Sequence, residues 1–380
     1  MEQRFLLLII AACLTGSVAA QGYRFTIRLD PVTPHAAADT VFFVAGNFNG
    51  WQPGAGGYRF HKTKAQAYEL TIAGLAGPLE FKITRGDWSK VETTAAGAAM
   101  TNRKIELVSD SVIRITVAGW QDHFLLPEKR HTASPNVRVV ENFYMPQLGR
   151  SRNLRIYLPE GYNSTPQKRY PVLYLQDGQN VFDAYTAYAG EWAVDEYLDH
   201  TKLPSCIVVA IDNGGGLRLN EYEPYPVKRI PRAEGDRYAA FLVKTLKPYI
   251  DGHYRTMKEK RHTSIAGSSM GGLISLYTAL KYPGVFGGIG VFSPSFWVTE
   301  KKIYEDIRKN GAFLRAALYF YVGMQEGDTM PEDLLKAVQE LQKAPGSRLT
   351  AVIRSGGRHN EEAWRKEFPL FYQALVSKNN

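Results

Sequence analysis

Residues 263–276 constrain the fold of this chain more than any other part of the sequence. The stretch begins as an apolar, strand-like run, turns through Gly267, Ser269 and Gly271, and continues as an apolar, helix-like run. The turn strains the backbone at Ser269, and side chains at the two flanking positions would collide with neighbouring strands, which explains the glycines there. A strand that enters a helix through so short a turn predicts a strand–helix unit.

The same alternation of strands and helices extends over the chain from Val137 onward. Its strands are almost continuously apolar, which predicts a mostly parallel sheet with helices on both faces, and therefore the α/β class. We expect strands at 172–175, 207–211, 264–266, 288–292 and 318–322. We expect helices at 236–250, 272–281 and 331–342.

Residues 22–119 follow a different rhythm, in which short apolar runs alternate with polar residues and are broken by turns. A period of two in such short runs predicts strands with one buried face. Runs of this kind lie at 25–29, 41–44, 68–72, 79–83 and 112–117. We therefore expect a small antiparallel β-sandwich of the immunoglobulin-like type, then a polar linker at 120–136 and the α/β domain at 137–378.

Residues 1–20 have the pattern of a secretory signal peptide, with cleavage expected before Gln21. The alternative is a lipoprotein signal in which Cys13 is lipidated. The sequence thus predicts a periplasmic or secreted protein. Cleavage before Gln21 would leave Cys206 as the single cysteine, and its place before an apolar run predicts a small buried residue.

Composition narrows the classes of partner. The formal charge is +9, but lysines and arginines are scattered, which favours a solvated basic face over nucleic-acid binding. No apolar run reaches about 18 residues, so no membrane span is expected. The zinc, phosphate-loop and dinucleotide motifs are missing, so the sequence predicts neither a metal nor a cofactor.

Gly-x-Ser-x-Gly between a strand and a helix is a nucleophile elbow, which predicts Ser269 as a catalytic nucleophile. A serine hydroxyl needs a base, and chains with this elbow follow the order serine, acid, histidine. His359 is the one histidine of eight that follows Ser269, and it is therefore the predicted base. The acid should follow the strand at 318–322, where Glu326 is favoured and Asp328 is the alternative.

An oxyanion formed by attack of Ser269 would need two preorganised amide donors. The first predicted donor is the N–H of Met270, which follows the nucleophile. The second is the N–H of Gln179, in the loop after the strand at 172–175.

The chain from 150 to 375 resembles the esterase family of the α/β-hydrolase fold that includes esterase D, feruloyl and acetyl xylan esterases and enterobactin-type siderophore esterases. The similar stretches are 170–180, 246–251, 266–272, 293–297 and 357–359. The resemblance implies a carboxylic-ester hydrolase without a metal that uses Ser269 and His359. Candidates for the substrate side are Arg218, Glu221 and Tyr222 in one loop, with Trp192 and Trp297 as possible pocket walls.

The N-terminal part is similar to the starch- and glycogen-binding sandwich modules, through residues 46–51 and the lysine strand at 80–83. In that family two tryptophans stack on sugar rings, while a lysine and an asparagine bind hydroxyl groups. The resemblance implies a carbohydrate site made of Trp51, Lys82, Trp88 and Asn102.

The leading hypothesis is an exported serine esterase that forms an acyl-enzyme, with acyl or feruloyl esters of carbohydrates as substrates. One alternative is a siderophore esterase, for which the positive charge would attract an acidic ligand. A second is acyl transfer to a sugar instead of water. A third, from another class, is a glycan-binding surface protein whose hydrolase domain is inert.

Overall fold

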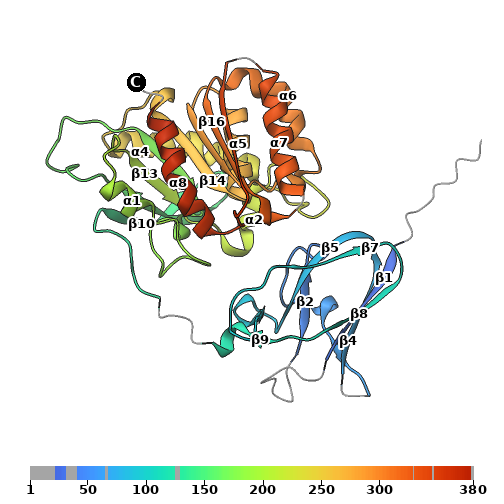
Figure 1. Ribbon diagram of the computed structural model, residues 1–380. Helices are drawn as coiled ribbons and strands as arrows, with labels where there is room; N and C mark the ends of the chain where they lie inside the picture. The colour runs from blue at the N-terminus through green and yellow to red at the C-terminus, as the bar shows by residue number, and fades with distance from the viewer. Residues whose placement is uncertain are drawn as a thin grey trace, which may run out of the picture. The chain divides into compact units, whose positions relative to one another are not determined.

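The computed structural model describes residues 22–30, 41–64, 67–124, 129–327, 329–344 and 346–377 (Figure 1). The predicted signal peptide, including Cys13, lies outside the described residues. Contacts divide the chain into two compact units, Met1–Glu128 and Lys129–Asn380.

An eight-stranded sheet forms the centre of the second unit, in the order β10-β11-β13-β12-β14-β15-β16-β17 (Figure 1). β10 and β11 are antiparallel to their neighbours, whereas all strands from β13 to β17 run parallel. The strands are β10 (Val137–Met145), β11 (Arg150–Tyr157), β12 (Val172–Gln176), β13 (Ile207–Ile211), β14 (Thr263–Ser268), β15 (Gly288–Phe292), β16 (Ala317–Gly323) and β17 (Arg348–Arg354). The predicted α/β class with a mostly parallel sheet is confirmed.

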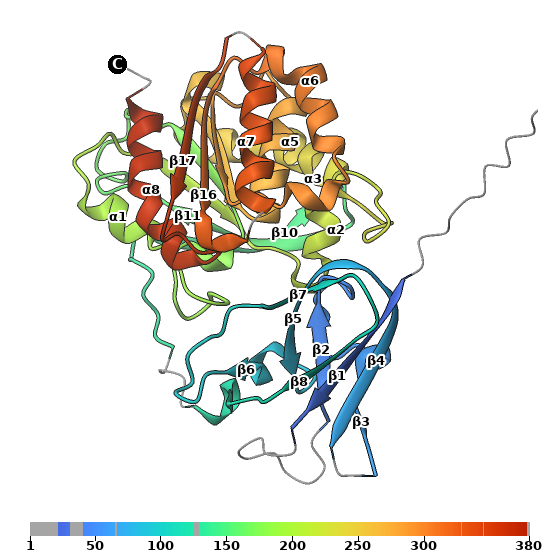
Figure 2. The ribbon, with the colours of Figure 1, turned by 45° about the vertical axis from the view of Figure 1, so that its right-hand side comes forward.

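Helices cover both faces of this sheet because successive strand residues point to opposite sides. In β12, Val172 and Tyr174 join the apolar cluster under α3 and α5–α7, while Leu173 and Leu175 join the cluster under α1 and α8 (Figure 2). The helices are α1 (Val194–His200), α2 (Arg218–Tyr222), α3 (Gly235–Phe241), α4 (Lys247–His253), α5 (Met270–Lys281), α6 (Lys302–Leu314), α7 (Thr329–Gln342) and α8 (Glu361–Val376).

The single helix predicted at 236–250 is instead divided. A wider π-helical turn, Leu242–Leu246, lies between α3 and α4. Pro248 near the start of α4 has no N–H to donate and its ring crowds the carbonyl four residues earlier, so a regular α-helix cannot pass through this point.

Parallel strands bring their carboxyl ends to one edge of the sheet. The segments that follow β12, β14, β15, β16 and β17 therefore converge there. They contain, in chain order, Gln179, Ser269, Ser293, Glu326 and His359.

The first unit contains a sheet in the order β3-β4-β1-β8, a second in the order β2-β5-β7, and the pair β6-β9. Alternate residues of β1 and β5 form one core, in which the rings of Phe25 and Phe81 meet edge to face at 5.7 Å. Its strands are β1 (Tyr23–Leu29), β2 (Phe43–Gly46), β3 (His61–Lys62), β4 (Tyr68–Leu75), β5 (Gly77–Thr84), β6 (Glu92–Thr93), β7 (Arg103–Leu107), β8 (Ser111–Ile115) and β9 (Gly119–Trp120).

The strand pairs of the first unit are antiparallel as predicted, with one exception. β1 and β8 run parallel, with Ile27 opposite Ile113. Strand direction follows from which distant strands become neighbours, and periodicity carries no information about that.

The predicted linker at 120–136 is structured at both ends. Trp120 is fully buried in the core of the first unit. On the other side, the N–H of Thr132 donates to Asp183 at 3.1 Å and the N–H of Ser134 donates to Asp195 at 2.7 Å. These hydrogen bonds attach the polar segment 132–134 to the second unit.

Candidate active site

The turn between β14 and α5 holds Ser269 in an unusual backbone conformation, with φ 59° and ψ −124°. Its N–H donates to the carbonyl of Phe292 at 2.9 Å, which ties the turn to the neighbouring strand. A Cβ on Gly267 would lie 2.7 Å from the backbone of Gly271, and a Cβ on Gly271 would lie 3.0 Å from Gln176. Both positions therefore require glycine, and the turn presents the Ser269 side chain at the carboxyl edge of the sheet.

The hydroxyl of Ser269 lies within hydrogen-bond distance of a second serine. Its Oγ is 3.0 Å from the Oγ of Ser295, and the N–H of Ser295 donates to the carbonyl of Ser269 at 3.2 Å. No hydrogen bond joins Ser269 to His359, although both residues are described. Catalytic hydrogen bonds are often long or poorly aligned without substrate and tighten in the complex.

The predicted base and acid are joined directly. Nδ1 of His359 lies 2.9 Å from Oε2 of Glu326, and the Glu326 side chain is fully buried. A carboxylate on Nδ1 places the proton on that nitrogen and leaves the lone pair of Nε2 to accept a proton. Asp328, the alternative acid, lies outside the described residues.

The other carboxylate oxygen of Glu326 also accepts hydrogen bonds. Oε1 accepts hydrogen bonds from the N–H of Gly323 and the hydroxyl of Ser293, each at 2.7 Å. The carboxylate is therefore fixed on both sides, and it can orient the imidazole ring of His359.

The two predicted oxyanion donors belong to segments that meet at this edge. The N–H of Met270 is the first of α5 and has no acceptor within the helix. In the loop after β12, Oε1 of Gln179 accepts from the N–H of Asn213 at 3.0 Å, and its carbonyl accepts from the hydroxyl of Thr186 at 2.8 Å. These bonds fix the side chain of Gln179 and the peptide group that follows it, without using its own N–H.

Comparison with known proteins identifies the family of this chain. Residues 146–373 match the family described as "Putative esterase". The chain belongs to this esterase family.

The relatives that are similar in sequence include one whose name states no activity and one whose name states an esterase activity. Uncharacterized protein YbbA of Bacillus subtilis (strain 168) is 26% identical over 246 residues, which cover 60% of this chain and 94% of that protein. An endo-1,4-beta-xylanase/feruloyl esterase of Xylanibacter ruminicola is 26% identical over 245 residues, which cover 63% of this chain but 31% of the relative.

Among solved structures, the enterobactin esterase FES from Shigella flexneri is similar with a TM-score of 0.51 and 15% identity. The similarity covers 93% of this chain and 92% of that one. It supports the fold, an α/β domain preceded by antiparallel sheets.

Within this esterase domain, two of the predicted substrate residues lie in the interior. Glu221 is fully buried and accepts hydrogen bonds from Arg150, at 2.9 Å, and from Arg152. Tyr222 is also fully buried, and its hydroxyl accepts from the N–H of Asp177 at 3.3 Å. Since neither side chain reaches solvent, the prediction that they contact a substrate is corrected to a structural role.

Arg218, the third predicted residue of that loop, forms an ion pair with Asp177. Its guanidinium donates to both oxygens of Asp177, at 2.6 and 2.8 Å, and Asn213 donates to the same carboxylate at 2.6 Å. Asp177 itself has φ 57°, so this network holds the bend that leads into Gln179. Arg218 therefore acts on the loop that carries the predicted oxyanion donor.

The two tryptophans predicted to wall the pocket have different surroundings. Trp192 is 5% exposed and packs against Phe292 and Trp364, so it belongs to the core and its predicted contact with substrate is corrected. Trp297 is 42% exposed, two residues after Ser295, with the guanidinium of Arg229 5.4 Å from its ring. It can contact a ligand.

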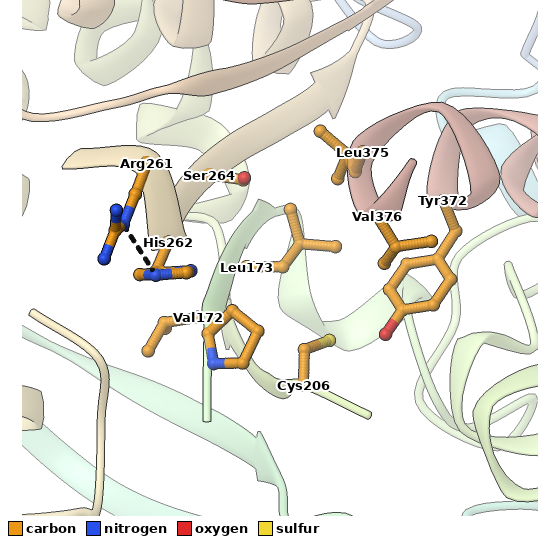
Figure 3. A pocket seen from close by; sticks show the side chains of 10 residues that line it. Val172, Leu173, Cys206, Arg261, His262, Ser264, Tyr372, Leu375 and Val376 are labelled. Atoms are coloured by element: carbon orange, nitrogen blue, oxygen red, sulfur yellow. Dashed lines mark hydrogen bonds between the residues drawn. The ribbon is translucent and has the colours of Figure 1, made fainter. Parts of the chain in front are cut away.

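A small cavity of about 30 Å³ lies at the opposite end of the strands (Figure 3). It is lined by the first residues of β12, by Ser264 and by Cys206 and Tyr372. A space of this size holds about one water molecule. Burial raises the pKa of the Cys206 thiol to about 12, as expected for an unreactive core residue.

Two of the four predicted carbohydrate residues, Trp51 and Trp88, lie side by side on the first unit. The rings of Trp51 and Trp88 are 6.3 Å apart. Nζ of Lys82 donates to the carbonyl of Met100 at 2.7 Å, and Asn102 donates to Glu80 at 3.0 Å. Both polar side chains are thus bound to protein groups here, while the two tryptophan rings remain partly exposed.

Sequence reasoning missed Ser293, Ser295 and Trp364, which all contact the predicted catalytic residues or their partners. The stretch 293–297 resembles the esterase family, and this resemblance indicates that the segment matters. It does not indicate what Ser293 and Ser295 do. Trp364 gave no signal, because an aromatic residue in an amphipathic helix is usually part of the core.

Among the residues with described structure, no three His, Cys, Asp or Glu side chains are grouped as a metal would require. Across the same residues, every helix is too short or too polar to cross a bilayer.

Glu223, one residue after α2, gives a prediction for stability. It is fully buried, and Oε2 has no hydrogen-bond partner among the described residues. Burial raises the pKa of Glu223 to about 7. The folded protein thus keeps a proton that the unfolded chain has released, so stability should fall as pH rises from about 4.5 to about 7 and then level off.

Glu223→Gln should remove about 2–3 kcal/mol of this pH dependence, because glutamine does not ionise. Urea unfolding at several pH values measures it, with the exposed Glu160→Gln as the control for the loss of a carboxylate. An identical pH dependence in wild type and Glu223→Gln would contradict the assignment.

Proposed function

We propose that this chain is an exported serine carboxylic-ester hydrolase. Ser269 Oγ attacks the acyl carbon, and its proton passes to Nε2 of His359. That proton is then given to the leaving alcohol, while the acyl group remains on Ser269. Water repeats the sequence, releasing the acid and restoring the serine.

The observation that carries this proposal is the hydrogen bond of 2.9 Å between Nδ1 of His359 and the buried carboxylate of Glu326. This bond fixes the imidazole with Nε2 free, at the same edge of the sheet as the strained turn at Ser269. Attack requires the Ser269 hydroxyl to exchange Ser295 for Nε2 of His359 as its hydrogen-bond partner.

We propose acyl or feruloyl esters of carbohydrates as substrates. Support comes from membership of the esterase family, from the name of the Xylanibacter relative and from the adjacent tryptophans of the first unit. Kinetics on a feruloylated or acetylated sugar, beside a siderophore lactone, test this choice. Faster hydrolysis of the lactone would favour the siderophore alternative, which the net charge of +9 and the Arg229–Trp297 contact support.

We further propose that the first unit binds glycan through Trp51 and Trp88. Each partly exposed ring offers an apolar face to a sugar, so Trp51→Ala should weaken binding to soluble starch or xylan about tenfold. Affinity electrophoresis measures this loss, and the exposed Val112→Ala on β8 serves as the control. Unchanged retardation of Trp51→Ala would contradict a glycan site here.

Export is proposed from the pattern of residues 1–20. Expression of the full chain in a bacterium with periplasmic secretion, followed by sequencing of the mature N-terminus, tests it. A mature chain that begins at Gln21 is expected. An intact N-terminus would contradict export, and lipidation at Cys13 would support the lipoprotein alternative in place of cleavage before Gln21.

A further inference from the structure

We propose that Trp364 and Ser293 are positioning residues that set how strongly Glu326 holds the Nδ1–H of His359. The side chains of Trp364, Ser293, Glu326 and His359 form one series of hydrogen bonds, from the indole to the imidazole. We call this series the relay. The inference deepens the proposed hydrolase function and rests on it for its catalytic meaning.

The donor and acceptor in each hydrogen bond of the relay follow from Trp364. Nε1–H of an indole donates and cannot accept, and it lies 2.9 Å from Oγ of Ser293. The Ser293 hydroxyl therefore accepts there and keeps its own hydrogen for another partner. That partner is Oε1 of Glu326, at 2.7 Å. The orientation of the Ser293 hydroxyl hydrogen is thus determined by its neighbour Trp364.

The donors then act on His359 through the charge of the carboxylate. Oε1 of Glu326 already accepts from Ser293 and from the N–H of Gly323, so it faces two donors. Oε2 is left as the acceptor for His359, 2.9 Å away. An acceptor opposite Nδ1 requires the proton on Nδ1, and Nε2 keeps the lone pair that a general base needs.

The backbone of Ser293 is held in a strained conformation that directs its side chain toward Glu326. It is fully buried and has φ 44°, a left-handed conformation that a serine rarely adopts. Its N–H donates to the carbonyl of Tyr321 at 2.7 Å, which connects it to β16, the strand that leads to Glu326.

Trp364 is fixed relative to His359 as well. The two rings meet edge to face, with centroids 5.2 Å apart. Asn360, the residue after His359, caps α8 by accepting the N–H of Ala363 at 3.0 Å. Because Trp364 follows Ala363 in this first helical turn, the base and the end of the relay are parts of one short structure.

Trp364→Phe tests the relay because it keeps an aromatic ring and removes the donor. Without the indole N–H, the Ser293 hydroxyl can turn away from Glu326, whose charge is then less neutralised and stabilises protonated His359 more. We expect kcat/KM at neutral pH to fall about tenfold and the apparent pKa of its acidic limb to rise.

The matched control is Trp192→Phe. Trp192 lies 5.8 Å from Trp364 in the same aromatic cluster and is equally buried, at 5% exposed, but the donor to Ser293 is Trp364. We expect it to lower the melting temperature similarly while the acidic limb stays in place. Equal shifts of the acidic limb in the two variants would overturn the relay.

Ser293→Ala supplies a second test through a double-mutant cycle. In a Ser293→Ala background the relay is already broken, so Trp364→Phe should shift the acidic limb no further. A shift as large as in the wild-type background would overturn the proposal.

A spectroscopic readout separates this inference from the proposed function. NMR of ¹⁵N-histidine-labelled protein should show His359 protonated at Nδ1 in both proteins, with the Nδ1–H proton further downfield in Trp364→Phe because the less neutralised carboxylate is the stronger acceptor. An Nδ1–H signal at the same chemical shift in both proteins would overturn the relay, whatever the activity. Absence of ester turnover in the wild type would overturn the proposed function instead.

Discussion

Ser269→Ala is expected to lower kcat for hydrolysis of a short nitrophenyl ester by about 10⁴–10⁶-fold. The substitution removes the one atom that can form the acyl-enzyme, so the remaining binding groups cannot compensate for it. The methyl group of alanine fits wherever the serine side chain fitted, and the fold should be unchanged. Steady-state kinetics and circular dichroism measure the two effects.

Ser275→Ala is the matched control for this experiment. Ser275 is a fully buried serine on α5, and its hydroxyl donates to the carbonyl of Gly271 at 2.7 Å. The same chemical change there should leave kcat within about threefold of the wild type, because the lost hydrogen bond acts on local stability alone. Undiminished hydrolysis by Ser269→Ala would remove Ser269 from the mechanism.

Glu326→Gln is expected to lower kcat by about 10³–10⁴-fold. Glutamine has almost the same shape, but its NH₂ group can face Nδ1 of His359 in place of an acceptor. The imidazole would then carry its proton on Nε2, where it could not accept the proton of Ser269. The pH profile of kcat/KM and a thermal melt separate this effect from a loss of folding.

Two further variants decide whether Glu326 is the acid. Asp328→Asn should retain nearly full activity, and the exposed Glu332→Gln on α7 serves as a general control for the loss of a carboxylate in this region. A large loss in Asp328→Asn together with a small loss in Glu326→Gln would assign the role to Asp328.

The central strands and the elbow could be predicted because their signals are local. Strands such as Ile207–Ile211 are apolar throughout, and the turn around Ser269 needs glycine on both sides. Chain order alone reduced the candidate bases to His359. The loop after β16 was predicted to hold the acid, and Glu326 is the residue there that contacts His359.

What could not be predicted depends on contacts between distant segments. Ser293 and Trp364 are 71 positions apart, and their hydrogen bond exists because the end of β15 and the start of α8 meet at the same edge. Glu221 resembled a polar pocket residue, yet two arginines from β11 neutralise it in the interior. The parallel pairing of β1 with β8 likewise follows from topology.

The resting hydrogen bond between Ser269 and Ser295 has a consequence for the same mechanism. An attacking serine must exchange this partner for Nε2 of His359. A substrate whose acyl oxygen accepts from the N–H of Met270 would favour the exchange, because the developing negative charge then lies at the N-terminus of α5.

Labelling with a fluorophosphonate tests the central claim most directly, since the reagent reacts with serines that a base has activated. Peptide mapping should place the phosphonate on Ser269, and His359→Ala should abolish the labelling. A phosphonate on Ser295 or another residue, or equal labelling of the wild type and His359→Ala, would contradict an activated nucleophile at Ser269.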